Sequence, residues 1–140
     1  MIDAFTGRYR FLSNFYPVTV SLDGIFYPSV EHAYQAAKTT DPEERVRVRR
    51  ARTPGLAKRR GQRVTLRAGW DEVKLGIMYD LVLQKFTRHA ILARQLSSTG
   101  DQELVEGNYW GDTFWGQCPV GAGFNHLGKI LMRVRGELGS

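Results

Sequence analysis

Cysteine is almost missing from this sequence, because Cys118 is its only one among 140 residues. A single cysteine excludes an internal disulfide and any metal site built from several thiolates. The three histidines have no metal-ligand spacing, and no HExxH motif, P-loop or nucleophile elbow occurs. No apolar run approaches membrane-spanning length, and no signal-peptide pattern opens the chain. We therefore expect a cytoplasmic protein that binds neither a metal nor a membrane.

Acidic residues are outnumbered, with 14 Asp and Glu against 20 Lys and Arg, for a net charge of +6. Half of the basic residues lie between residues 45 and 67, where no acid occurs. They are Arg45, Arg47, Arg49, Arg50, Arg52, Lys58, Arg59, Arg60, Arg63 and Arg67. Such density indicates an anionic partner, either nucleic acid or a phosphorylated small molecule, although a run of charge is also typical of a solvated helix face.

What remains is the composition of a globular protein, with 42% hydrophobic and 11% aromatic residues. The length is enough for a genuine core and predicts one domain, residues 1–140. The chain shows no internal repeat and no linker. The pattern of elements predicts a mainly α fold, α+β by a small margin, as a compact helical domain with one β-hairpin and a short extra strand.

Local signals place these elements along the chain. Residues 18–22 and 25–27 flank Asp23-Gly24, which is typical of a hairpin with a type I′ turn. Helices are predicted from about 29 to 39, 42 to 52, 53 to 61, 71 to 87, 90 to 96 and 125 to 138. Residues 103–106 predict the short strand, and the aromatic, glycine-rich residues 108–123 predict a loop.

The helix predicted at 71–87 has the longest stripe of apolar side chains at helical spacing. We expect Trp70 and Met78 to lie in the core along this stripe. Lys74 and Lys85 lie at its edge, where a lysine usually covers apolar surface with its methylenes and keeps its ammonium in water.

One short run concentrates polar chemistry. Glu31, Tyr34, Gln35 and Lys38 are spaced i, i+3, i+4 and i+7, which puts all four on one face of a helix. A carboxylate and an amine on one stripe can perform acid–base or covalent chemistry. The same spacing fits an exposed helix with an i,i+4 charge pattern, so spacing alone leaves both interpretations open.

Two later segments could contact a ligand. Trp110 could stack on a flat base and Asp112 could hold ribose hydroxyls or exchange a proton, although the rings of such a loop can also anchor it to the core. The glycines before Asn125 lead into a helix start, where free backbone N–H groups can bind phosphate. Asn125 is also a natural N-cap, and that role alone would explain it.

Taken together, five ordered motifs resemble the YbiA-like, or NADAR, family. They are residues 11–15, residues 27–38, Trp70 with Val73 and Lys74, residues 109–112 and residues 125–132. The resemblance implies a small, mainly α enzyme that hydrolyses an N-glycosidic bond between ribose C1 and a nitrogen, without a metal or cofactor. It implies one of two substrates: ADP-ribose attached to guanine in nucleic acid, or the phosphoribosylamino-pyrimidine intermediates of riboflavin synthesis.

The resemblance also implies the site. Its catalytic residues would be Glu31, Lys38 and Asp112, and its substrate-binding residues Ser13, Asn14, Tyr34, Gln35, Trp70, Trp110 and Asn125. Either Glu31 stabilises charge at C1, or Lys38 forms a Schiff base with an opened ribose. Removal of ADP-ribose from guanine is the expected activity, with the phosphoribosylamino substrates as the alternative and a non-catalytic ADP-ribose or NAD-binding module as the third. The sequence leaves the oligomeric state open.

Overall fold

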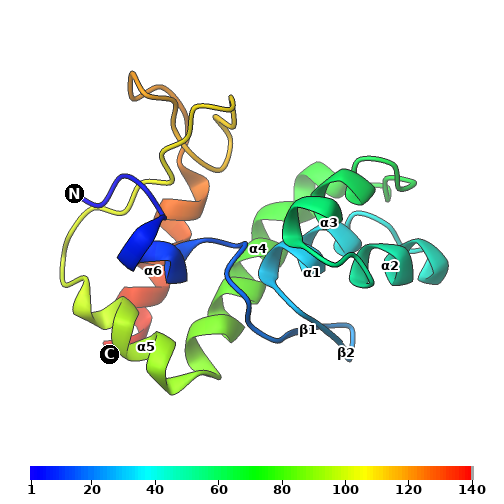
Figure 1. Ribbon diagram of the computed structural model, residues 1–140, viewed down its shortest axis with the longest axis horizontal. Helices are drawn as coiled ribbons and strands as arrows, with labels where there is room; N and C mark the ends of the chain where they lie inside the picture. The colour runs from blue at the N-terminus through cyan, green and yellow to red at the C-terminus, as the bar shows by residue number, and fades with distance from the viewer. Residues whose placement is uncertain (140) are drawn as a thin grey trace. The chain divides into compact units, whose positions relative to one another are not determined.

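The computed structural model of the protein describes residues 1–139 (Figure 1). The chain folds into two compact units, one formed by Asn14–Lys85 and the other by Met1–Ser13 with the chain from Phe86 onward. Helices dominate both, and the described sheet is a two-stranded antiparallel hairpin. This confirms the predicted mainly α fold class. None of the helices within residues 1–139 is both long enough and apolar enough to cross a membrane.

The unit Asn14–Lys85 opens with the hairpin, formed by β1 (Val20–Leu22) and β2 (Ile25–Tyr27). Val20 lies opposite Tyr27, and Leu22 lies opposite Ile25. Asp23 and Gly24 both have positive φ, 51° and 81°, as a type I′ turn requires, so the predicted turn is confirmed.

Three short helices follow the hairpin, and a side-chain cap begins each of them. Helix α1 (Val30–Ala37) begins where Ser29 Oγ accepts the His32 N–H. Helices α2 (Pro42–Arg49) and α3 (Pro54–Gly61) begin after Asp41 and Thr53, and each has a proline in its first turn. Helix α1 packs against both α2 and α3. Every residue of α1 is buried, so the alternative of an exposed charged helix is wrong.

Helix α4 (Trp70–Thr87) contains Trp70 and Met78, which are buried as predicted. Lys85 is also buried, with only 1% of its surface exposed, so the prediction that its ammonium reaches water is wrong. Its neighbours Val82 and Phe86 are buried too. The Lys85 Nζ lies 5.6 Å from the ring centroid of Tyr16, and burial lowers its pKa to about 7.

The second unit contains a 3-10 helix, η1 (Gly7–Leu12), which the sequence did not predict. Helix α5 (Ala90–Ser98) packs against η1 and against α6 (His126–Leu138). In place of the strand predicted at 103–106, Leu104 forms a single parallel bridge with Ile2. The ladder ends there because the Gly107 N–H turns back to the Val105 carbonyl at 2.9 Å.

Candidate functional site

The polar face of α1 is organised around Glu31 and Gln35. The Gln35 Nε2 donates to the Glu31 Oε2 at 2.6 Å, and both side chains are buried. The Glu31 backbone N–H donates to the Asn14 carbonyl at 3.1 Å, which ties the start of the helix to the segment before the hairpin. The Asn14 side chain continues inward and places its Nδ2 3.5 Å from the Met78 Sδ. The carboxylate is therefore held in one orientation by α1 itself.

Two aromatic rings border this face. Tyr34 on α1 and Trp70 at the start of α4 have ring centroids 5.3 Å apart, at an interplanar angle of 51°. Both rings are almost fully buried. The Lys38 Nζ lies 5.9 Å from the centroid of Tyr34, one turn further along α1. The Tyr34 ring therefore lies within cation–π range of the amine.

Lys38 has a lowered pKa, which is one property that nucleophilic lysines share. Burial lowers the pKa of its ammonium; Glu31 opposes this shift, while the positive charges of Lys58 and Lys74 lower the pKa further. A lowered pKa increases the fraction of neutral amine, the form that attacks carbonyl carbon. The backbone fixes the residue as well, because its carbonyl accepts the Arg67 N–H at 2.7 Å.

Helix α3 holds Gln35 in place by close approach. A Cβ added at Gly61 would lie 2.8 Å from both Cβ and Cδ of Gln35 and would overlap its Oε1. That Oε1 is buried and accepts no hydrogen bond within residues 1–139, so the amide is held only by Glu31 and by packing. Only glycine allows α3 to pass this close to the amide that orients Glu31.

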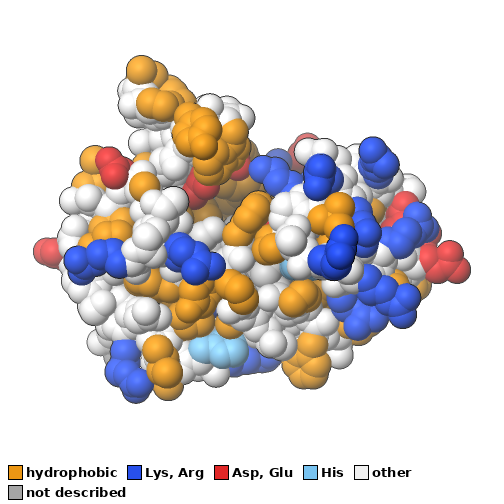
Figure 2. Space-filling view, in the orientation of Figure 1, with side chains coloured by type: hydrophobic (Ala, Val, Ile, Leu, Met, Phe, Trp, Pro, Cys, Tyr) orange, Lys and Arg blue, Asp and Glu red, His pale blue; other side chains and the backbone are white. Residues whose placement is uncertain are grey.

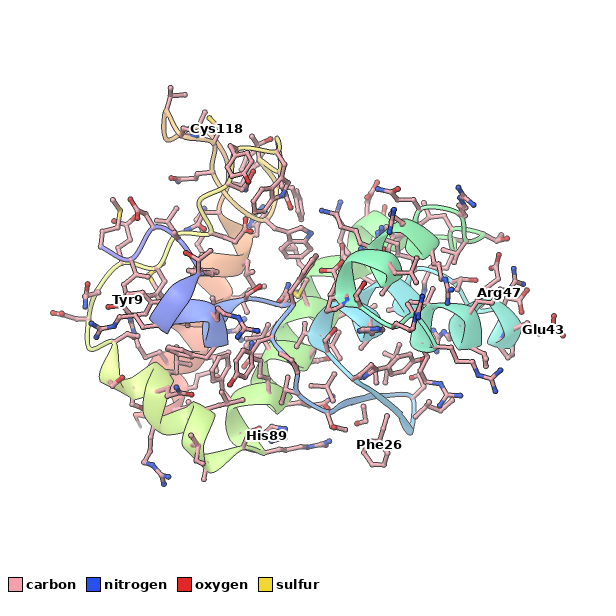
Figure 3. All side chains as sticks on the ribbon, in the orientation of Figure 1. Tyr9, Phe26, Glu43, Arg47, His89 and Cys118 are labelled. Atoms are coloured by element: carbon pink, nitrogen blue, oxygen red, sulfur yellow. The ribbon has the colours of Figure 1, made fainter. Side chains whose placement is uncertain are left out.

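The remaining predicted residues lie in the other unit. The Asp112 Oδ1 accepts the backbone N–H groups of Phe114 and Trp115, at 3.2 and 2.9 Å, and so closes a turn. Trp110 is 57% exposed and packs edge-to-face against Tyr109, with centroids 5.4 Å apart. In Figure 3, the label of Cys118 shows the reader where this loop lies. Trp110 is thus accessible to a ligand, whereas the Oδ1 atom of Asp112 stabilises the conformation of the loop.

Asn125 occupies the N-cap position of α6, as predicted. It has left-handed backbone angles, φ 51° and ψ 42°, and its side chain makes no capping hydrogen bond, so only the side-chain part of that prediction is wrong. The left-handed conformation turns the amide toward residues 104–106. There its Oδ1 accepts the Glu106 N–H and its Nδ2 donates to the Leu104 carbonyl, both at 2.9 Å. Asn125 therefore joins the start of α6 to a distant backbone segment.

The structure brings the predicted residues together in part. Those assembled in the unit Asn14–Lys85 are Asn14, Glu31, Tyr34, Gln35, Lys38 and Trp70. Those of the other unit are Ser13, which is half-buried just after η1, with Trp110, Asp112 and Asn125. Sequence reasoning did not place Lys58, Lys74 and Gly61 at the site; the motif of Trp70, Val73 and Lys74 gave a signal for Lys74, and only tertiary contacts give one for Lys58 and Gly61. Within residues 1–139, no three His, Cys, Asp or Glu side chains gather in a group that could hold a metal ion.

A buried carboxylate and a partly desolvated lysine on one helix, bordered by aromatic rings, are typical of a small hydrolase or lyase site. The comparisons define the class. The NADAR domain model matches residues 4–139, and the chain belongs to this family.

Two relatives and one solved structure illustrate the similarity. The chain is 42% identical over 133 residues to a riboflavin biosynthesis protein of Vibrio vulnificus, with 94% of this chain covered but only 36% of that protein. It is 42% identical over 135 residues to an N-glycosidase of Nostoc punctiforme, covering 93% and 86% of the two chains. The NMR structure of Escherichia coli YbiA superposes with a TM-score of 0.85 at 35% identity, covering 99% and 87% of the two chains. The recognised resemblance is thereby confirmed.

Proposed function

We propose that this protein is an N-glycosidase that cleaves the bond between ribose C1 and a base nitrogen. The observation that carries the proposal is the pairing, on one face of α1, of the oriented Glu31 carboxylate with Lys38, whose pKa burial lowers. Family membership and the name of the Nostoc punctiforme relative support the same chemistry.

The chemistry follows from these two groups. Cleavage develops positive charge at C1, and the bonding electron pair leaves with the base nitrogen, which then needs a proton. In the covalent route, the neutral Lys38 amine adds to C1 of the opened ribose, and the base departs with that electron pair and a proton. Water then adds to the Schiff base, releases the sugar as its aldehyde and regenerates the amine. Glu31 transfers the protons and balances the positive charge of the Schiff base.

For the substrate, we favour ADP-ribose attached to guanine in nucleic acid. A polyanionic substrate needs a cationic surface, and the exposed members of the basic run between 45 and 67 offer one. Trp110, exposed and aromatic, would stack on the base, and Asp112 would hold ribose hydroxyls through its Oδ2. Ser13 and Asn125 stay predicted substrate residues.

The second candidate substrate is a phosphoribosylamino-pyrimidine. The Vibrio vulnificus relative is named for riboflavin biosynthesis, and this chain covers 36% of it. Such a substrate needs only a few cations for one phosphate group, so its turnover should depend weakly on salt.

Mass spectrometry of a guanine-ADP-ribosylated oligonucleotide tests the proposal. The wild type and a Lys129→Ala control, altered at an exposed lysine of α6, should both release ADP-ribose and restore guanine, and Lys38→Ala should release none. Borohydride should trap a sugar adduct on Lys38 in the wild type. Near-normal turnover by both Lys38→Ala and Glu31→Ala would contradict the assignment. An unchanged oligonucleotide, with cleavage of a phosphoribosylamino-uracil, would move the substrate to the second candidate.

A further inference from the structure

We propose that eight of the ten basic residues between 45 and 67 form two sets with different roles. The first set ties the unit together. The second, the exposed arginine surface, binds the sugar–phosphate backbone of the nucleic acid. The exposed arginine surface consists of Arg47, Arg50, Arg52, Arg59 and Arg63. The inference rests on the proposed function, because it assigns this surface to the substrate of the α1 site.

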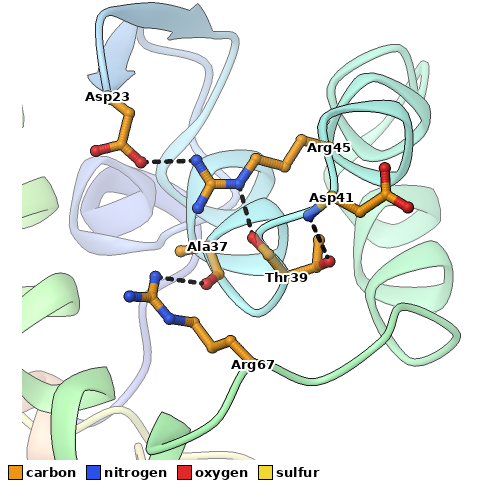
Figure 4. Close-up of polar contacts among 6 residues, drawn as sticks. All are labelled: Asp23, Ala37, Thr39, Asp41, Arg45 and Arg67. Atoms are coloured by element: carbon orange, nitrogen blue, oxygen red, sulfur yellow. Dashed lines mark hydrogen bonds and ion pairs between the residues drawn. The ribbon is translucent and has the colours of Figure 1, made fainter.

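The first set consists of Arg45, Arg60 and Arg67, whose guanidinium groups bind other groups of the protein. Figure 4 shows the contacts of Arg45 and Arg67. The Arg45 Nη1 lies 2.7 Å from the Asp23 Oδ2, and its Nε donates to the Thr39 carbonyl at 2.7 Å. The Arg67 Nη1 donates to the Ala37 carbonyl at 3.4 Å. The Arg60 Nη1 likewise donates to the Arg47 carbonyl at 2.7 Å. These arginines join α2, α3 and the hairpin to the end of α1, so their guanidinium groups are less available to a ligand.

The side chains of the exposed arginine surface point into solvent and leave their guanidinium groups available to a ligand. All five side chains are exposed, and none forms an ion pair or a side-chain hydrogen bond within the described part of the chain. Figure 2 shows Lys and Arg side chains gathered over the end of the unit that α2 and α3 form, and Figure 3 places Arg47 at the outer part of α2. Like charges gathered close together repel one another, and a bound polyanion would offset that repulsion.

The shape and chemistry of this surface favour nucleic acid. Its members come from α2, the connection to α3, α3 itself and the segment after it, so one diphosphate group is too small to contact them all. Guanidinium groups match phosphate oxygens with two parallel hydrogen bonds. An anionic membrane would also need an apolar face for insertion, whereas the apolar residues of α2 are Val46 and Val48, and Val48 is buried.

The surface also borders the α1 site. Helix α3 touches α1 where Gly61 meets Gln35, and the segment after α3 returns to α1 where the Arg67 N–H donates to the Lys38 carbonyl. Lys58, one turn before Gly61, acts electrostatically on Lys38. A nucleic-acid backbone bound across α2 and α3 would therefore lead its modified base toward Lys38.

The test is fluorescence anisotropy with a labelled, unmodified single-stranded oligonucleotide between 50 and 200 mM NaCl. Five neutralised phosphates give a log–log salt slope of about −3.5, or roughly 100-fold weaker binding over that range. Arg52→Gln with Arg63→Gln should reduce the slope by about 1.4. Arg94→Gln with Lys129→Gln, a double change of equal charge at exposed positions of α5 and α6, should leave it unchanged. Circular dichroism checks that both variants are folded.

Equal loss of binding in the two double variants would overturn the assignment to this surface. Tighter binding to vesicles containing anionic phospholipid than to the oligonucleotide would overturn the choice of nucleic acid. The oligonucleotide has no ADP-ribose, so the outcome does not depend on catalysis. Salt-dependent binding through these arginines without ADP-ribose release would contradict the proposed function alone, and release without any difference between the variants would contradict this inference alone.

Discussion

The close approach of α3 to α1 makes Gly61→Ala the most informative single substitution. The new Cβ would lie 2.8 Å from Cβ and Cδ of Gln35 and overlap its Oε1. Gln35 is 3% exposed and hydrogen-bonded to Glu31, so its side chain has no space to move aside. Either the two helices separate or the bond to Glu31 breaks.

The expected cost is the balance of two terms. Overpacking a buried contact costs about 1–3 kcal/mol. The higher helix propensity of alanine returns at most about 1 kcal/mol, and less at the last residue of α3. We expect the free energy of unfolding to fall by about 1–2 kcal/mol, which lowers the melting temperature by roughly 3–7 °C in a chain of this length.

Calorimetry and turnover together check this reasoning. Gly76→Ala is the matched control, because a Cβ at this exposed position of α4 has no atom within 4 Å. It should raise the melting temperature slightly and leave turnover unchanged. Gly61→Ala should lower both, since a displaced Gln35 no longer orients Glu31. If Gly61→Ala stabilises the protein as Gly76→Ala does, α3 does not approach Gln35 as closely as described, and the reasoning is refuted.

Three further predictions concern stability. Burial lowers the pKa of Lys85 to about 7, so between pH 7 and about 10.5 the unfolded state binds one more proton than the folded state. The free energy of unfolding should therefore rise with pH in this range, by up to about 1.4 kcal/mol per pH unit. Urea unfolding of the wild type should show this rise, and a Lys85→Met variant that still shows it would refute Lys85 as the cause. Burial also lowers the pKa of His32, so the stability that its neutral imidazole contributes is complete above about pH 6.5 and is lost as the pH falls toward the lowered pKa. An NMR titration that places the His32 midpoint above about 6.5 would contradict this. Asn125→Ala leaves the Glu106 N–H and the Leu104 carbonyl without their partner and should destabilise the protein by about 2–4 kcal/mol, measured by chemical unfolding. An unchanged unfolding midpoint would contradict the structural role of these two bonds.

Local signals in the sequence predicted much of the secondary structure. Ser29, Asp41 and Thr53 cap three helices through bonds to N–H groups two or three residues ahead, and Asp23-Gly24 forms the turn of the hairpin. These features could be predicted because each depends on atoms only a few residues apart. The i, i+3, i+4, i+7 spacing of the α1 face is local in the same way, and it identified the residues around Glu31 and Lys38.

Contacts between distant segments explain the predictions that were wrong. Periodicity placed Lys85 at the edge of a stripe, but its burial depends on what covers that end of α4. Asn125 stands at the predicted N-cap position, yet its amide bonds to backbone groups about twenty residues earlier in the chain and not to the helix. The strand at 103–106 needed a longer partner than the chain near Ile2 provides.

The sequence by itself therefore determined the α-helices, the hairpin and the polar face of α1, because backbone preferences and side-chain spacing act over a single turn. Only the tertiary structure decided that this face is buried and that Gly61 holds Gln35 against Glu31. It also decided that Lys58 and Lys74 help to lower the pKa of Lys38, and which arginines are tied down and which are exposed. Burial and electrostatic shifts depend on every segment that surrounds a group, and those segments meet only when the chain is folded.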